Sequence, residues 1–479
     1  MKLLNIFKGS LLFLFSKYFI FGIQFLNSIL IAVYLGPFYL GVWGFITMIF
    51  QYFEQLNFGV PHGVSVALAL NKERHGYLQS VIGNSLIQSI AISILVGIGF
   101  SILVYYFNFG SSYYVSEYFI VILLIACLTN IINVLSNICR IYNQFYILII
   151  IQSLLPVSIL VVSFFFKREF LLSALLYSQL TTTIISVLLL FMTIPIKVKY
   201  NLSWKLFNKL RKVAIPLFFY NASFYLIMIS TRSFISTYNV KEFGLFTFSF
   251  SLGNALFLLL DSVSFLIWPK LIRSMNKYSG DRALEKLRDY RILYHTATHF
   301  IMYISLLLYP LLIVYFEKYR ATQNSFTMVV LTLVMLSNAF GYQGLMVAKG
   351  KQKKLAVVAL FCLLINLVMC YYLVFIIRTN YYGVLFGTMI AYMVFSVLLV
   401  KQGISILNIG KGKLINNLSL YITPSMLLPY VLTCASVITG RPSWVILSFV
   451  IFLIFNYKNC LYLFKTIIEI IKDPKILEF

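Results

Sequence analysis

The sequence predicts an all-α polytopic membrane protein of about fourteen transmembrane helices, with two six-helix lobes in a pseudo-two-fold repeat plus two C-terminal helices. Three observations lead there: the composition, the spacing of apolar runs and the distribution of basic residues. The 479 residues are 61% hydrophobic and 11% charged, with a mean hydropathy of +0.92. A soluble protein carries about 25% charged residues. The deficit extends over the whole chain, which excludes a soluble domain of any size.

A helix that crosses a bilayer needs about 20 mostly apolar residues. The first such run follows Lys2 and Lys8, as a signal peptide would, but its length and Lys17 favour a retained helix. The second run contains Gly59 and Pro61, which predicts a bend near its cytoplasmic end. The predicted runs are residues 11–35, 41–70, 81–106, 117–139, 145–166, 170–194, 214–236, 244–267, 294–316, 326–348, 355–377, 383–400, 418–439 and 443–464.

Basic residues test this map. The net charge is +25, from 38 Lys and Arg against 13 Asp and Glu. With the N-terminus inside, 28 of the 38 basic residues fall in cytoplasmic segments and seven in external loops. This positive-inside bias predicts that both termini are cytoplasmic, and it explains the basic charge without a nucleic-acid partner. Residues 196–213 and 269–293 mix basic and apolar side chains, which predicts interfacial amphipathic helices against anionic lipid.

Residue types that bind metals give no site. The six cysteines lie in or beside apolar runs and form no CxxC pair, so neither a metal knuckle nor a redox pair is indicated. His295 and His299 are four residues apart, but the Glu of the zinc-protease pattern is absent. We expect no metal, no cofactor and no catalytic residue, and we expect that the chain is not an enzyme.

A layout recurs in the first and seventh helix pairs. Residues 35–45 and 238–246 each form a tight external turn that ends in an aromatic or apolar residue, followed by Gly and an apolar helix. Each helix then carries one acid, Glu54 or Asp261, with Pro61 or Pro269 near its cytoplasmic end. Two parallel halves explain this pattern and would place a substrate site between them; chance similarity of helical hairpins is the alternative.

The predicted organisation follows from this repeat. It consists of an N-terminal six-helix lobe (1–195), a cytoplasmic interfacial linker (196–213), a C-terminal six-helix lobe (214–402), and two further helices with a cytoplasmic tail (403–479).

Residues 35–45 and 56–63 resemble the N-terminal signature of bacterial oligosaccharide-lipid flippases, and 244–269 resembles its second-half counterpart. These are the Wzx-type O-antigen and capsule transporters of the multidrug/oligosaccharidyl-lipid/polysaccharide exporter superfamily. The resemblance implies a V-shaped two-lobe transporter in the bacterial inner membrane. It would flip an undecaprenyl-pyrophosphate-linked oligosaccharide to the periplasmic leaflet by alternating access. It also implies the glycan polymerase of the same pathway as a partner. Fourteen helices fit this branch, whereas the drug-exporting branch usually has twelve.

Charges inside apolar helices cost about 2.5–3.5 kcal/mol each on insertion scales, so each needs a reason. Lys17 and Arg232 are the candidate cavity cations for the pyrophosphate. Lys17 could instead snorkel to the interface or pair with Glu54. Arg232 could snorkel outward; it lies too far in depth from Asp261 to pair with it, so a ligand phosphate is its candidate partner.

Glu54 and Asp261 are the only acids deep in the apolar runs, which makes them candidates for ion or proton coupling. An ion pair or a helix-capping contact is the alternative. Gly59, Pro61 and Pro216 are candidate hinge residues. A structural role is expected for Lys458 in the last run.

Two other functions compete with the flippase. A membrane-embedded glycan polymerase or glycosyltransferase usually displays a large external loop, but every external loop here is shorter than about 12 residues. A cation-coupled multidrug exporter of the same superfamily would need an acid in the first half and an apolar cavity. Glu54 meets the first requirement, whereas Lys17 and Arg232 argue against the second.

Overall fold

The structure is a computed structural model, which describes residues 2–70, 75–166, 168–196, 198–200, 203–407 and 423–472. All regular elements in these ranges are helical, so the predicted all-α class is confirmed. Two units, Met1–Thr247 and Phe248–Phe479, each hold their own set of contacts. The boundary between them lies within one helix, α8 (Val240–Lys277). The division into two six-helix lobes stays a prediction.

The other helices of the first unit are α1 (Lys2–Gln55), α2 (Val60–Leu70), α3 (His75–Tyr106), η1 (Ser111–Tyr113), α4 (Phe119–Ile141), α5 (Phe145–Phe165), α6 (Arg168–Thr193) and α7 (Trp204–Ile235). Those of the second unit are α9 (Gly280–Val314), η2 (Glu317–Thr322), α10 (Gln323–Ser337), α11 (Tyr342–Ala348), α12 (Gln352–Tyr371), η3 (Tyr372–Ile376), α13 (Leu385–Ile406), α15 (Pro424–Ile438), α16 (Ser443–Phe455) and α17 (Tyr457–Lys472).

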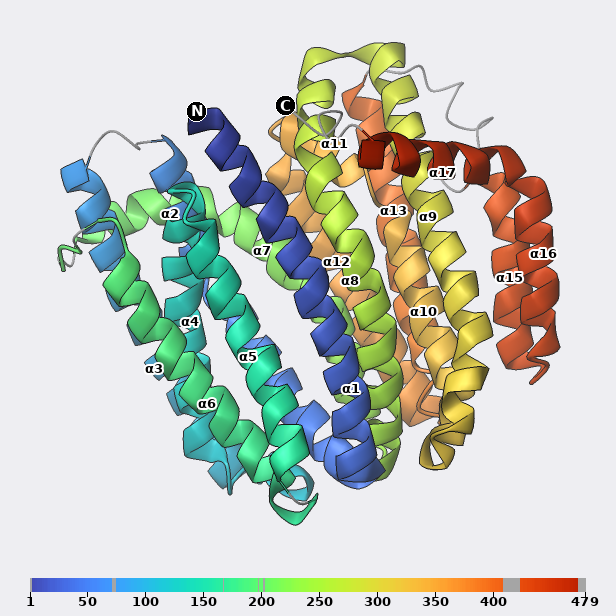
Figure 1. The fold of residues 1–479 in the computed structure, drawn as a ribbon, viewed down its shortest axis with the longest axis horizontal. Helices are drawn as coiled ribbons and strands as arrows, with labels where there is room; N and C mark the ends of the chain where they lie inside the picture. The colour runs from blue at the N-terminus through green and yellow to red at the C-terminus, as the bar shows by residue number, and fades with distance from the viewer. Residues whose placement is uncertain are drawn as a thin grey trace. The chain divides into compact units, whose positions relative to one another are not determined.

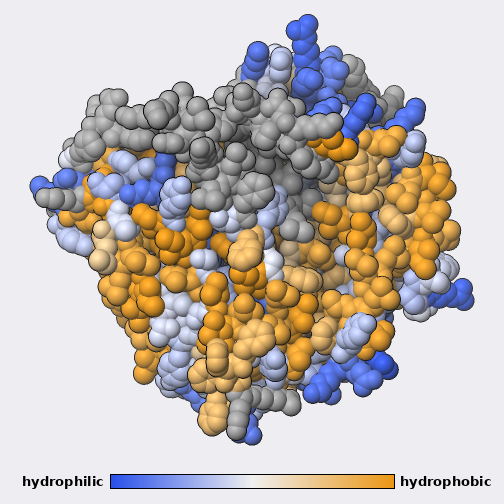
Figure 2. All heavy atoms as spheres, viewed as in Figure 1, coloured by the Kyte–Doolittle hydropathy of each residue, from blue (hydrophilic) through white to orange (hydrophobic). Residues whose placement is uncertain are grey.

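Every predicted apolar run corresponds to helix in the described residues. Nine helices there are long and apolar enough to cross a membrane, and the bent pair α16–α17 would make a tenth. The polytopic class is therefore confirmed, while the count of fourteen stays a prediction. Figure 2 shows hydrophobic side chains along the flanks of the helices, with hydrophilic ones gathered toward their ends. Exposed apolar flanks of this extent are expected where lipid takes the place of water.

The predicted turn after the first run lies inside α1. Gly36 has φ 71° and ψ 172°, which is not helical, and the next residue is Pro37, which has no N–H to donate. The start of α1 and the short helix α2 lie at the same end of the first unit (Figure 1), so the chain reverses within α1. The predicted run 11–35 and the first part of the run 41–70 are thus two helices joined by a kink at Gly36 within the span Lys2–Gln55.

The predicted bend in the second run is confirmed as a complete break. Helix α1 ends at Gln55, and α2 begins at Val60. Between them, Phe58 and Gly59 have positive φ angles of 49° and 77°. Pro61 then occupies the first turn of α2, where its missing N–H costs no hydrogen bond.

The last predicted run, 443–464, is not one straight helix. It ends as α16 at Phe455, and α17 then leaves at an angle of 77°. Figure 1 shows α17 lying at a steep angle to α16. Lys458 consequently belongs to α17 and not to the apolar helix α16.

Neither expected interfacial segment forms a separate helix. Residues 204–213 are the first turns of α7, and 269–293 are divided between the end of α8 and the start of α9. In α7, Trp204 is exposed while Leu206 packs against Ala67 and Val81. The continuation of each segment into a long helix explains the difference, because helix propagation is favourable once a helix is nucleated.

Candidate functional site

The two turns that suggested the repeat lie against each other inside the first unit. A Cβ atom at Gly41 would overlap the carbonyl oxygen of Val240, and one at Gly244 would overlap that of Pro37. Each glycine thus contacts the residue four positions before the other. Reciprocal contact of this kind is the signature of a two-fold relation. It favours a true repeat over chance similarity.

The same relation continues one turn along both helices. Gly44 and Thr247 follow their respective glycines by three positions, and a Cβ at Gly44 would overlap the Thr247 hydroxyl. Equivalent positions therefore meet each other directly. We call the four residues Gly41, Gly44, Gly244 and Thr247 the glycine seam. Small residues let the two backbones approach closely, as at helix crossings within membranes.

Arg232 on α7 lies next to this seam and is only 2% exposed. Its Nη2 donates to the carbonyl oxygen of Gly44 at 3.0 Å, and its Nη1 donates to Gln51 Oε1 at 2.7 Å. The neighbouring Ser233 Oγ lies 2.7 Å from the Tyr52 hydroxyl. A buried guanidinium needs acceptors because it cannot lose its proton. Neutral groups of α1 supply two of them.

Sequence reasoning proposed a ligand phosphate as the partner of Arg232 and missed these protein acceptors. Gln51 lies 181 positions before Arg232 in the chain. The available signal was that Gln51 and Tyr52 interrupt an apolar run with polar groups. The structure brings Arg232 to α1, and its role toward a ligand stays a prediction.

Glu54 lies one residue before the end of α1 and is half-buried. No described side chain forms an ion pair or hydrogen bond with its carboxylate; the ion pairs of the described residues are Lys286–Asp289 and Arg320–Glu317. An anion at a helix C-terminus also faces the negative end of the helix dipole. Glu54 is thus in an electrostatically unfavourable place, as a group that changes protonation or binds a cation would be.

The remaining predicted residues are placed as follows. Lys17 is half-buried on α1, and its role stays a prediction. Gly59 and Pro61 lie at the α1–α2 break, where the Asn57 side chain accepts from Gly59 N–H at 2.8 Å. Asp261 on α8 and Pro216 on α7 have helical backbone, but their side chains lie outside the described residues. Their roles stay predictions.

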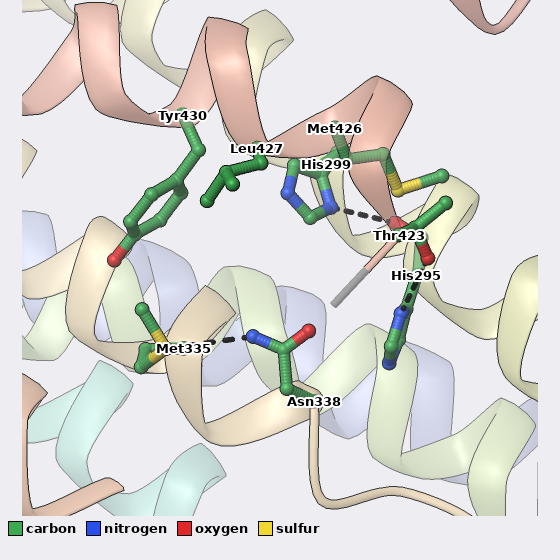
Figure 3. A pocket seen from close by; sticks show the side chains of 8 residues that line it. All are labelled: His295, His299, Met335, Asn338, Thr423, Met426, Leu427 and Tyr430. Atoms are coloured by element: carbon green, nitrogen blue, oxygen red, sulfur yellow. Dashed lines mark hydrogen bonds between the residues drawn. The ribbon is translucent and has the colours of Figure 1, made fainter. Parts of the chain in front are cut away.

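A pocket in the second unit is lined by eight residues from α9, α10, α15 and the segment beside them (Figure 3). The pocket has room for about one water molecule. The lining residues are His295, His299, Met335, Asn338, Thr423, Met426, Leu427 and Tyr430.

The two histidines of this pocket are buried and have defined partners. His295 Nε2 lies 3.2 Å from the Ser337 carbonyl oxygen, and its Nδ1 lies 3.4 Å from Thr423 Oγ1. His299 Nδ1 lies 2.9 Å from the His295 carbonyl oxygen. A carbonyl only accepts, so the hydrogen is assigned to Nε2 of His295 and to Nδ1 of His299. Both nitrogens of His295 thereby have hydrogen-bond partners within the protein.

Comparison with known proteins was informative only at the level of structure. No protein-family model matches the sequence, and no curated protein matches it. An inward-facing multidrug resistance MATE family transporter of the MOP superfamily aligns with 82% of this chain and 96% of its own, at 17% identity and a TM-score of 0.64.

The chain has the fold of the MATE transporters. A second such structure, a mutant of the Vibrio cholerae MATE transporter VcmN, aligns with 84% of this chain and 96% of its own, at 13% identity and a TM-score of 0.58. An outward-facing MATE structure of the MOP superfamily covers 83% of this chain and 93% of its own, at 16% identity and a TM-score of 0.56. These similarities concern the fold, because all three structures share less than 20% of their residues with this chain.

Proposed function

We propose that this chain is a flippase that moves an undecaprenyl-pyrophosphate-linked oligosaccharide, an O-antigen or capsule repeat unit, from the cytoplasmic to the periplasmic leaflet. The glycine seam is the observation that carries the transport part of this proposal. It joins two repeat-related helices of a MATE fold by a reciprocal contact, as a protein of two equivalent moving halves requires. MATE structures have been solved in inward-facing and outward-facing forms, which supports alternating access.

Two features support a lipid-linked anion over a drug as the substrate. Lys17 and Arg232 are cations in apolar helices, and arginine binds phosphate oxygens in pairs. The inward-facing MATE structure and the VcmN mutant each align over 96% of their own length, but these alignments include only 82–84% of this chain. Additional chain is expected if two helices are added for a polyprenyl-linked substrate.

In this proposal the substrate replaces one of the present hydrogen-bond partners of Arg232. The guanidinium now donates to Gln51 and to the Gly44 carbonyl oxygen. A pyrophosphate would replace the neutral Gln51 oxygen by a charged one, which forms a stronger hydrogen bond. Gly44 would keep the second contact and hold the side chain in place. Both termini would remain in the cytoplasm.

The test is translocation of a fluorescent lipid-linked pyrophosphate oligosaccharide in proteoliposomes. We expect Lys17→Ala and Arg232→Ala to lose at least about tenfold in rate, since each removes a charge-assisted contact worth about 1.5–3 kcal/mol. Lys318→Ala, which changes an exposed lysine of η2, is the matched control and should keep the wild-type rate. Wild-type rates in both Lys17→Ala and Arg232→Ala would refute the assignment of these cations.

A cation-coupled multidrug exporter is the second candidate, and one observation favours it. The Glu54 carboxylate has no described side-chain partner at the end of α1. In an exporter, Glu54→Gln should abolish drug efflux driven by a proton or sodium gradient while the protein stays folded. In a flippase without such coupling, Glu54→Gln should leave lipid translocation unchanged. Drug efflux by the wild-type protein, without any flipping of the lipid-linked glycan, would decide for the exporter.

A further inference from the structure

The bend between α16 and α17 is held by a buried asparagine. The Asn456 amide donates to the carbonyl oxygens of Ser425 and Phe452 at 3.0 and 3.1 Å. Its Oδ1 accepts from the Ser425 hydroxyl at 2.7 Å. Asn456 therefore ties the end of α16 to the start of α15 and satisfies groups that a helix end leaves open. The 77° turn is a built feature and not a frayed terminus.

One face of α17 packs on its own unit. Cys460 and Leu463 are buried, and Phe464, at the border of this face, places its ring edge-on to Phe300 of α9, with the ring centroids 5.5 Å apart. These contacts fix the rotation of α17 about its axis. The direction in which its other side chains point is therefore defined.

A second face of α17 is apolar but uncovered. Tyr457, Leu461, Phe464 and Ile468 recur at spacings of three and four residues, so they form one row along the helix. Each is between 45% and 63% exposed. In a helix that turns away from the membrane-crossing direction, such a row needs an apolar environment beside the protein.

A row of lysines borders this apolar row. Lys458, Lys465 and Lys472 follow one another at intervals of seven residues, which is about two helical turns or 10 Å. The side chains of Lys458 and Lys465 are exposed; that of Lys472 lies outside the described side chains, and only its position is used. Further round the helix come the exposed Tyr462 and the acid Glu469, and then the polar Asn459 and Thr466. The order around α17 is thus protein, apolar and basic, followed by a mixed polar face.

We propose that α17 is an anionic-lipid-binding helix that lies in the plane of the membrane surface. Its apolar row enters the edge of the hydrocarbon, and its lysine row binds the phosphates of anionic headgroups. This order of faces matches the order that a helix meets from hydrocarbon to water. A neutral partner would make no use of three lysines in one row. A second copy of this chain is disfavoured, because like charges would then face each other.

The first test measures lipid binding by the purified full-length protein in detergent, by titration with fluorescent phosphatidylglycerol or phosphatidylcholine. Each lysine near an anionic surface strengthens binding about fivefold, so Lys458→Gln with Lys465→Gln should weaken phosphatidylglycerol binding about 25-fold. Phosphatidylcholine binding should not change. The matched control is Lys241→Gln with Lys318→Gln, two exposed lysines on other elements, which should change neither.

Equal phosphatidylglycerol affinity in the α17 and control variants would overturn the lysine part of the proposal. The second test places a spin label at Leu461→Cys or Thr466→Cys in a chain whose native cysteines are replaced. In vesicles containing phosphatidylglycerol, the label at 461 should meet oxygen dissolved in lipid, and the label at 466 should meet a water-soluble relaxant. Equal access of water to both labels, or a dimer that protects 461 without lipid, would overturn the interfacial placement. Neither readout depends on transport.

Discussion

Among the helix breaks of the described residues, the one between α1 and α2 in the first unit and the one between α10 and α11 in the second are completed in different ways. Between α1 and α2 the chain uses its own side chain: Asn57 accepts from Gly59 N–H at 2.8 Å and donates to the Glu54 carbonyl oxygen at 2.5 Å. Between α10 and α11 the free carbonyls are met from another helix. Arg291 of α9 donates to Asn338 O at 3.4 Å, and His295 lies 3.2 Å from Ser337 O.

The two breaks differ in which contacts must be given up if the chain bends there. The Asn57 hydrogen bonds move with the α1–α2 break, since their donors and acceptors lie between Glu54 and Gly59. One bond reaches this break from another helix, from Asn137 Nδ2 of α4 to the Pro61 carbonyl oxygen at 3.3 Å. The α10–α11 break can move only by giving up contacts to buried groups of α9, and the Arg291 guanidinium also lies 4.8 Å from the centre of the Tyr342 ring. The first break suits a hinge, as the sequence predicts for Gly59 and Pro61. The second suits a rigid support.

The largest effect should come from removing the long-range support. Arg291→Ala takes a donor from the buried Asn338 carbonyl oxygen and a stacked cation from Tyr342, so we expect a loss of about 3 kcal/mol of stability. The measurement is the apparent melting temperature of the purified protein in detergent. The control is Arg288→Ala, an exposed position on the same helix, which should change little. An equal melting temperature for both variants would mean that Arg291 does not support the break.

A smaller effect is expected from Gly341, which lies in the α10–α11 break with φ 90°. A Cβ there would lie 2.9 Å from Leu287 Cδ1 and 3.2 Å from Arg291 Cγ, so Gly341→Ala adds crowding to backbone strain. We expect a loss of about 2 kcal/mol. Gly350→Ala is the matched control, because Gly350 also has positive φ but open space around its Cβ position. That variant should lose only about 1 kcal/mol. Equal losses would show that α9 exerts no steric hold on the break.

The smallest effect should come from the self-capped break. Asn57→Ala removes one side-chain cap in a place open to water at its edge, so we expect about 1 kcal/mol of lost stability. Asn57→Asp keeps the acceptor for Gly59 N–H and should recover part of that loss. Thermal unfolding of both variants checks this. A loss as large as that of Arg291→Ala would erase the contrast between the two breaks.

The sequence predicts much of the fold because apolar runs and basic loops have a direct physical cause in the bilayer. It also predicts the turn at Gly36-Pro37 and the break at Gly59-Pro61, where residue chemistry acts locally. The bend at Asn456 escaped prediction, because a lone asparagine in an apolar run does not reveal that its partner is Ser425. Only the folded chain brings those two residues together.

The candidate site likewise has residues that the sequence predicts and partners that it does not. Arg232, Glu54 and Lys17 were identified because charges are costly in lipid. The acceptors of Arg232, Gln51 and Gly44, were missed because they lie 181 and 188 positions earlier in the chain. The break before α11 was also missed. Its signal, Gly341, occurs in a run where a glycine alone is tolerated inside a helix.

The glycine seam has a consequence for the history of the chain. Two copies of one half-length protein, associated about a two-fold axis, would make the Gly41 and Gly244 contacts twice by symmetry, and a single gene would control both sides. In a fused chain each side mutates alone. The two sides of the axis differ in the present sequence, because Gly44 contacts Thr247 and not another glycine. The hydroxyl stands on one side of this contact only, an asymmetry that a dimer of two identical halves could not have.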